Sequence, residues 1–325
     1  MRRAVLLYNP FSGRHRVDQV HAAGEVLRRG GVDAEAVATR AAGSAGVQAR
    51  EALERGYDTV LACGGDGTVH EVLQGIVGTP VALGVIPLGT ANALAADLGL
   101  PRSAASAAER ALHFEPRQVA VGALDYATKH GSESRYFLVA AGAGPDAHLM
   151  YKLNPQVKRH FGMTAYYTHA AWIWATHAYP KFRVEFFDSG TGRWRNETVT
   201  QVLAIRIGVF GGLLHQLAPG ASLERDDFRL VLFKTASRVR YLAYVLRCIA
   251  RGFWKIPGVE LVNATEVVCH AAQTRRRIYV EADGELLGTV PARMSLRPAA
   301  IQLLMPPINA AGHPVEASSE RTLNR

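Results

Sequence analysis

The 325-residue sequence predicts an α/β fold in two parts: an N-terminal doubly wound parallel sheet and a C-terminal, largely antiparallel, β-sandwich-like domain. Strands and helices alternate through residues 1–120, which is typical of a parallel sheet covered by helices on both faces. Short β-like runs separated by turn residues dominate residues 121–305. The polar stretch 306–325 lacks periodicity and predicts a flexible tail.

The individual elements follow from these patterns. In the first part, we expect strands at residues 4–8, 32–38, 59–63 and 81–86, and helices at 17–29, 46–55, 69–77 and 91–98. In the second part, the β-like runs are 136–140, 182–187, 198–209, 229–233, 266–270, 278–282 and 300–304. Two helical segments, 157–176 and 239–253, interrupt these runs. The last strand is a candidate to return toward the first domain.

Composition narrows the class of protein. Hydrophobic residues at 48% and charged residues at 20% are typical of a globular chain. The longest apolar runs, such as 81–88, are far shorter than the ~20 residues of a spanning helix. The apolar run after the basic start is broken at Asn9-Pro10, which favours a buried strand over a signal peptide. Three cysteines without paired spacing fit a reducing cytoplasm and give no metal signature.

The net charge of +9 favours an anionic partner, which could be a nucleotide, a nucleic acid or a membrane surface. No recognition motif or dense basic stripe supports nucleic acid, so we expect no nucleic-acid partner.

The strongest motif is Gly64-Gly65-Asp66-Gly67-Thr68, which follows a predicted strand and opens a predicted helix. Glycines let backbone amides approach an anion, and the helix N-terminus adds partial positive charge. Thr68 can donate to a phosphate, while Asp66 can bind Mg²⁺ or orient a nucleophile. The alternative is a tight turn in which Asp66 or Thr68 merely caps the helix. His70, in the same helix, reads as a solvated or capping histidine.

Three further segments weaken that alternative. Asn9-Pro10-Phe11-Ser12-Gly13 ends the first strand, and Pro87-Leu88-Gly89-Thr90-Ala91-Asn92 follows the fourth, so both lie with the glycine motif at the carboxyl edge of the sheet, where ligands bind. Asp283-Gly284-Glu285 lies in the second domain, where Asp-Gly between β-runs also fits a plain hairpin turn.

In this order, the four segments resemble the diacylglycerol kinase catalytic family, which includes bacterial lipid kinases and sphingosine and ceramide kinases. The matching positions are Asn9-Pro10-x-Ser12-Gly13, Gly64-Gly65-Asp66-Gly67-Thr68-x-x-Glu71-Val72, Pro87-x-Gly89-Thr90-x-Asn92 and Asp283-Gly284-Glu285. The resemblance implies an ATP- and Mg²⁺-dependent kinase that transfers the γ-phosphate to a lipid hydroxyl, with diacylglycerol, giving phosphatidic acid, as the first candidate acceptor.

The resemblance also implies a role for each matching residue. The nucleotide-binding residues would be Asn9, Ser12, Gly13, Thr39, Gly64, Gly65, Gly67, Thr68, Glu71, Gly89, Thr90 and Asn92. The catalytic carboxylates would be Asp66, Asp283 and Glu285, with either aspartate as the general base. Phosphoryl transfer demands alignment and charge neutralisation, so a carboxylate facing the nucleotide from the second domain would place the acceptor between the domains.

Many bacterial relatives in this family hold a structural metal, bound by an Asp side chain and by main-chain carbonyls three residues before it and two after. Leu223, Asp226 and Phe228 match that spacing. The usual Asp-Gly reads Asp226-Asp227 here, and an aspartate expected before Val121-Gly122 is Ala120.

Basic residues alternate with aromatic and aliphatic ones in both predicted helices of the second domain. This composition suits peripheral binding to an anionic membrane from the cytoplasm, although the apolar faces can equally pack on the sheet. A homodimer is possible on the sequence alone.

Other acceptors remain open: a sphingoid base, ceramide or phosphatidylglycerol. NAD kinases share Gly-Gly-Asp-Gly-Thr, so a soluble-substrate kinase is the nearest rival, and a non-catalytic lipid-binding relative is another.

Overall fold

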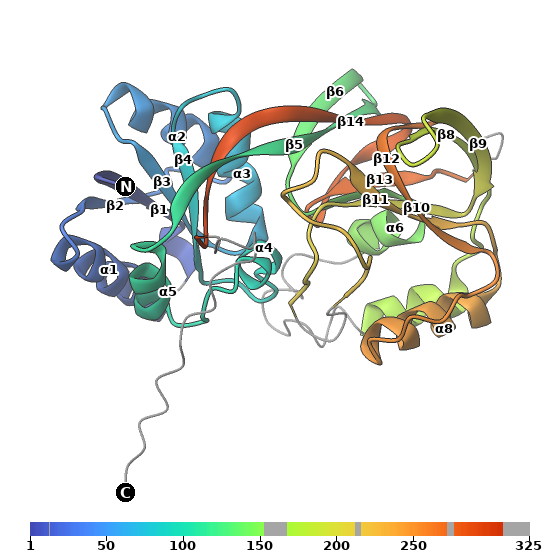
Figure 1. Ribbon diagram of the computed structural model, residues 1–325, viewed down its shortest axis with the longest axis horizontal. Coiled ribbons are helices and arrows are strands. Elements are labelled where there is room, and N and C mark those ends of the chain that lie inside the picture. The colour runs from blue at the N-terminus through green and yellow to red at the C-terminus, as the bar shows by residue number, and fades with distance from the viewer. Residues whose placement is uncertain (13, 153–167, 212–215, 272–275, 308–325) are drawn as a thin grey trace, which may run out of the picture.

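The computed structural model describes residues 1–12, 14–152, 168–211, 216–271 and 276–307, which form two lobes joined by two long strands (Figure 1). The strands of the N-terminal lobe are β1 (Arg3–Tyr8), β2 (Asp33–Ala38), β3 (Thr59–Gly64) and β4 (Ala82–Pro87). Its helices are η1 (Pro10–Ser12), α1 (Arg14–Arg29), α2 (Ala45–Glu54), α3 (Asp66–Ile76), α4 (Ala93–Asp97) and α5 (Ala104–Ala111).

The N-terminal sheet is parallel, with the strand order β2-β1-β3-β4. β1, β3 and β4 are apolar runs and are almost wholly buried, because helices cover the sheet, whereas the edge strand β2 is largely exposed or half-buried. β1, β3 and β4 all end at one edge, so the loops after Tyr8, Gly64 and Pro87 lie next to each other. This order confirms the predicted doubly wound α/β class.

The C-terminal lobe is mainly antiparallel. Its strands are β6 (Gly131–Phe137), β7 (Ala140–Ala143), β8 (Phe182–Asp188), β9 (Arg193–Val199), β10 (Gln201–Ile205), β11 (Phe228–Phe233), β12 (Val259–Cys269) and β13 (Tyr279–Ala282). Its helices are α6 (Pro145–Lys152), residues 168–176, and α8 (Arg238–Ile249). β14 pairs with both β13 and β12, so β14, β13, β7, β10, β11 and β12 close into a ring around an apolar core, which agrees with the predicted sandwich-like domain.

β5 (Glu115–Thr128) and β14 (Glu285–Met305) run antiparallel through both lobes and arch between them in Figure 1. Ile301 and Leu303 of β14 belong to the core of the N-terminal lobe, whereas Met294 belongs to the core of the C-terminal lobe. The end of β14 pairs in parallel with β4, so this strand does return to the first sheet. The expected boundary between residues 120 and 121 falls inside β5.

Several predicted elements differ from those in the structure. The predicted strand 136–140 is broken, because the backbone amides of residues 138–140 bind the Asp283 carboxylate instead of a neighbouring strand. The helix predicted at 239–253 ends at Ile249, shortly before Arg251, which has a positive φ of 52°. Helix α5 was not expected. Of the predicted helix 157–176, residues 157–167 lie outside the described residues, as does most of the predicted tail.

Within the described ranges, no helix is both long enough and apolar enough to cross a bilayer.

Helices α2 and α3 touch through two glycines, and this contact sets a testable limit on side-chain size. A Cβ on Gly75 would lie 1.9 Å from the carbonyl oxygen of Gly46. Gly24 in α1 is also an interior helical glycine, but its Cβ would meet only the flexible end of Arg28, at 3.4 Å.

We therefore expect Gly75→Ala to lower the free energy of unfolding by about 1–3 kcal/mol, because the backbones of α2 and α3 must separate. The matched substitution Gly24→Ala should raise it by roughly 0.5–1 kcal/mol through helix propensity. Urea denaturation of both variants measures this. Shifts in the same direction would show that the close contact does not limit α3.

Candidate active site

The loops after β3 and β4 are in direct contact at the carboxyl edge of the parallel sheet. The amide of Leu88 donates to the carbonyl of Gly64 at 2.9 Å, and a Cβ on Gly89 would lie 2.3 Å from the Cα of Gly65. Gly89 therefore has no room for a side chain. Thr68 packs over Gly64, whose Cβ would lie 2.2 Å from the Thr68 Oγ1. The result is a bare backbone surface at the start of α3.

Asp66 occupies the first turn of α3. Its Oδ1 accepts a hydrogen bond from the amide of Ala93 at 2.7 Å, which ties the start of α3 to the start of α4. Burial raises the pKa of Asp66, and the nearby charge of Asp283 adds to that shift. Asn92 closes the intervening loop with two hydrogen bonds to the backbone of Gly89, both 2.9 Å long, from a left-handed conformation with φ of 52°.

The other residues predicted to bind the nucleotide fall into two groups. Some of them support the loops, and the others lie at open positions. Glu71 accepts from the amides of Gly43 and Ala45 at 3.0 and 3.3 Å, so it caps α2 within the lobe. Asn9 Oδ1 accepts from the amide of Phe11 at 2.9 Å, which shapes the loop after β1. The amide of Thr39, after β2, donates to the Tyr8 carbonyl at 2.8 Å.

For three of the residues predicted to bind the nucleotide, the structure describes few or no contacts. Thr90 is exposed. The Ser12 backbone lies in η1, whereas its side chain and Gly13 lie outside what the structure describes.

Asp283 lies in the two-residue hairpin between β13 and β14. Asp283 and Gly284 both have positive φ, 49° and 80°, as an Asp-Gly turn of type I′ requires. The carboxylate is buried and accepts from the amides of Leu138 (3.1 Å), Val139 (2.8 Å) and Ala140 (3.1 Å). The plain hairpin interpretation is therefore correct, but this hairpin also locks the break between β6 and β7.

His70 Nδ1 lies 3.4 Å from Asp283 Oδ2. The histidine is buried between the two lobes, so the expectation of a solvated or capping histidine was wrong. The only sequence signal for the burial of His70 was its place in the predicted helix, on the face that carries Val69 and Leu73.

Glu285, the first residue of β14, is exposed and reaches the start of α3. Its Oε1 would lie 3.0 Å from a Cβ on Gly67. The second lobe therefore presents Asp283 and Glu285 to the turn that holds Asp66. The structure brings these three predicted carboxylates together, across more than 200 residues of sequence.

A buried acid pair that the sequence motifs did not predict lies beside this cluster. Glu281 of β13 and Asp146 of α6 share a hydrogen bond. Burial raises the pKa of both groups, and that of Glu281 lies well above its ordinary value because Asp146 and Asp283 add negative charge. A glutamate two residues before Asp283 in an otherwise apolar strand was the available signal.

Asp97, at the end of α4, was also missed. Its Oδ1 accepts from the amides of Gly208 and Val209 at 2.9 and 2.8 Å, which joins the two lobes. Burial raises the pKa of this carboxyl to about 6.

The loop expected to hold a structural metal has a different arrangement. The Leu223 carbonyl already accepts a hydrogen bond from Arg206 at 3.2 Å, Asp226 is exposed, and Phe228 begins β11. One of the three expected ligands, the Leu223 carbonyl, therefore already has a hydrogen-bond partner in Arg206.

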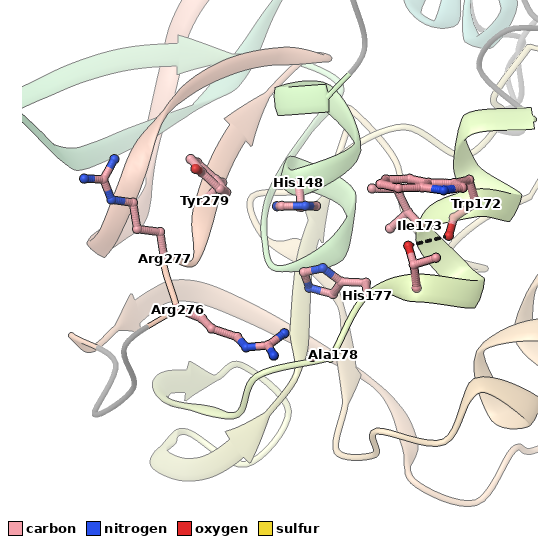
Figure 2. Close-up of a pocket in the computed structure, with 9 residues that line it drawn as sticks. His148, Trp172, Ile173, His177, Ala178, Arg276, Arg277 and Tyr279 are labelled. Carbon is pink, nitrogen blue, oxygen red and sulfur yellow. Dashed lines mark hydrogen bonds between the residues drawn. The ribbon is translucent and has the colours of Figure 1, made fainter.

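A cavity of about 450 Å³ opens in the C-terminal lobe between α6 and helix 168–176 (Figure 2). Its walls include His148, Trp172, His177 and Tyr279, with Arg276 at its edge. The pKa of His177 falls to about 4, because burial, His148 and Arg276 all disfavour its charged form. Tyr279 and Asp283 lie on the same hairpin, roughly 13 Å apart along the strand.

The acid pair sets a pH dependence. Because the folded pKa of Glu281 is raised, the pair's contribution to stability is complete below the unfolded pKa of about 4.5 and declines as the pH rises toward the folded value. The variant Glu281→Gln can keep the hydrogen bond to Asp146, but its amide has no proton that titrates in this pH range. Its stability relative to the wild type should therefore increase between pH 5 and 8, by up to ~1.4 kcal/mol per pH unit.

Urea denaturation at several pH values measures this difference. The exposed Glu54→Gln serves as the control and should give a constant offset from the wild type. A constant offset for Glu281→Gln as well would mean that the pair holds no additional proton.

Comparison with known proteins identifies the lobes. Residues 3–124 match the family profile "Diacylglycerol kinase catalytic domain", and residues 139–305 match "YegS C-terminal NAD kinase beta sandwich-like domain". The diacylglycerol kinase of Bacillus subtilis is 28% identical over 312 residues, covering 94% of this chain and 97% of the relative. That of Staphylococcus saprophyticus is also 28% identical, over 294 residues, covering 89% and 91%.

A solved diacylglycerol kinase structure from Bacillus anthracis has the same fold, with a TM-score of 0.67 at 17% identity, over 96% of this chain and 98% of that one. The two profiles lie in the order of the two lobes and together span almost all of β1 to β14. The chain therefore belongs to the diacylglycerol kinase family, a lipid kinase family in which the catalytic domain is followed by a YegS-type β-sandwich-like domain.

Proposed function

We propose that this protein is an ATP- and Mg²⁺-dependent lipid kinase that transfers the γ-phosphate of ATP to a lipid hydroxyl, with diacylglycerol as the first candidate acceptor. One observation carries the proposal: the Asp283–Glu285 hairpin of the second lobe meets the Gly64–Thr68 turn of the first, so that three carboxylates surround the start of α3. An acceptor hydroxyl held between the lobes would face a phosphate held by that turn.

The bare loops suit the phosphates of ATP. Gly65 precedes α3 and has no side chain to cap the first turn, so the backbone amides of that turn can bind an anion. Gly89 brings a second loop to the same place. Thr68 and Thr90 supply hydroxyl groups. Mg²⁺ bound with the nucleotide would neutralise phosphate charge, and Glu285, which reaches the start of α3, would be a carboxylate ligand for it.

The two candidate general bases differ in what their oxygens already bind. Asp283 accepts hydrogen bonds from three backbone amides and lies beside His70. Together these contacts occupy most of the lone pairs of its carboxylate. Asp66 binds Ala93 through Oδ1, and burial raises its pKa, which favours proton acceptance near neutral pH. These differences favour Asp66 as the base and Asp283 as the residue that positions the lobes.

A kinase assay tests the proposal directly. The purified protein, labelled ATP and Mg²⁺ should yield labelled product with at least one lipid from a panel of diacylglycerol, sphingosine, ceramide, phosphatidylglycerol and polyprenol. Asp66→Asn should lower kcat by at least about 100-fold with little change in the KM for ATP, since the loss falls on proton transfer.

A second variant tests the contact that Asp283 makes between the two lobes. Asp283→Asn keeps one acceptor oxygen, so it should lower stability by about 1–3 kcal/mol and lower kcat less than Asp66→Asn does. A larger loss of kcat at Asp283 than at Asp66 would exchange the two roles. No product with any lipid, alongside phosphorylation of NAD, would favour the soluble-substrate alternative.

The lipid must reach the site from a membrane, and α8 offers a surface for this. Its exposed apolar side chains recur with helical spacing: Val239, Leu242, Val245, Leu246 and Ile249. Phe253 and Trp254 extend the same region, and the exposed basic residues Arg238, Arg240, Arg251 and Lys255 surround it. An apolar strip bordered by cations suits an anionic bilayer.

Helix 168–176 belongs to the same surface. It lies beside α8 at the end of the molecule away from the N-terminal lobe (Figure 1). The Trp174 indole donates to the Arg238 carbonyl at 2.8 Å, which ties the two helices together. Trp172 is half exposed and also lines the cavity, so the proposed membrane surface adjoins this cavity. We place this binding at the cytoplasmic face of the membrane.

Vesicle sedimentation tests this surface. The wild type should bind vesicles that contain anionic lipid, and binding should weaken as salt is raised. Leu246→Ser with Phe253→Ser should weaken binding by roughly tenfold or more, because two exposed apolar side chains are lost. Val47→Ser on α2 is the matched control, since Val47 is equally exposed but lies on the N-terminal lobe. Equal losses in both proteins would contradict a docking role for α8.

A further inference from the structure

The strongest unexplained feature outside the proposed active site is a fully buried arginine. Arg206 follows β10, and its side chain has no solvent exposure. Such a charge is costly to bury unless hydrogen bonds satisfy it. Arg206 Nη1 donates to the carbonyls of Arg225 and Asp227 at 2.6 and 3.1 Å. Arg206 Nη2 donates to those of Ala120 and Leu223 at 2.8 and 3.2 Å.

Four carbonyl oxygens thus converge on one positive charge. Converging main-chain carbonyls are a ligand set that hard cations use in proteins. Here the oxygens meet nitrogen atoms at ordinary hydrogen-bond distances, and the planar guanidinium fills the space between them. Leu223, one of these acceptors, is also one of the three residues whose spacing suggested a metal site.

The charges around the guanidinium are consistent with this role. The carboxylates of Asp226 and Asp227 lie near the guanidinium and favour its charged form, which arginine keeps at neutral pH. Asp227 is itself paired with Arg225, whose Nε donates to it at 2.7 Å. Residue 120, where the family resemblance led us to expect an aspartate, offers only its backbone carbonyl.

We propose that the Arg206 guanidinium takes the place of a divalent cation in the 223–228 loop, so that this loop is held without metal. The cation's position is occupied by a side chain of the chain itself. Arg206 also fixes β5 through Ala120, and Asp97 binds the amides two and three residues further on, so segment 206–209 is anchored from both lobes. Divalent ions are then needed only with the nucleotide. This inference does not depend on kinase activity.

Thermal unfolding of the nucleotide-free protein tests the proposal. Tm should change by less than about 1 °C on adding EDTA, MgCl₂ or CaCl₂, because no cation binds the loop. Arg206→Met keeps the bulk of the side chain but leaves four carbonyls unsatisfied, and it should lower Tm by roughly 5 °C or more. Arg225→Met is the matched control on the same loop; it removes an exposed ion pair and should lower Tm by less than about 2 °C.

The outcomes separate clearly. Stabilisation of the wild type by Mg²⁺ or Ca²⁺ that disappears in Asp226→Ala would overturn the proposal, because a cation would then occupy the loop. Equal stabilisation of both proteins would come from an ion elsewhere and would leave the loop metal-free, as proposed. A Tm for Arg206→Met no lower than that for Arg225→Met would also overturn it. If Arg206→Met does not fold, the cation titrations of the wild type and of Asp226→Ala decide alone.

Discussion

The ladder between β5 and β14 is the constraint on which the two-lobed structure depends. β14 begins at Glu285, beside the α3 turn, and ends at Met305, after pairing with β4 in the sheet of the N-terminal lobe. Between these ends it contributes side chains to both apolar cores. The ladder shifts register between Arg297 and Ile301, at the passage from one lobe to the other. Because one continuous strand carries both ends, the carboxylates of Asp283 and Glu285 and the glycine loops of the N-terminal lobe are held in a fixed relation.

Three charged side chains that join distant segments are matched to backbone groups. Asp283 binds three amides, Asp97 binds two, and Arg206 binds four carbonyls. Each of these groups joins segments that are far apart in sequence, and each lies where regular pairing stops. A backbone partner cannot be lost by a change of side chain, so such links constrain the chain path more tightly than an exposed ion pair does.

The parallel lobe could be predicted well, because its strands are short apolar runs separated by amphipathic helices and its loops carry glycine motifs. The carboxylates Asp66, Asp283 and Glu285 were named from those motifs, and the fold brings them together. The break at residues 138–140 could not be predicted, since it depends on a carboxylate more than 140 residues away. For the same reason, nothing in the sequence around Arg206 indicated that its side chain would be buried against carbonyls. Glu281 and Asp146 interact only because α6 packs on β13.

The Asp283–Gly284 hairpin has a consequence for how this protein can vary in length. A two-residue turn of type I′ cannot accommodate an extra residue, and side chains alternate faces along each strand. Inserting one residue there would turn every following side chain of β14 to the opposite face until a bulge restored the register. Met294 and Leu303 would then leave their cores together, and Glu285 would move away from Gly67. A substitution in this hairpin changes the contacts of one side chain, whereas an insertion or deletion would disturb both lobes, so length variation in this chain should be confined to its other loops.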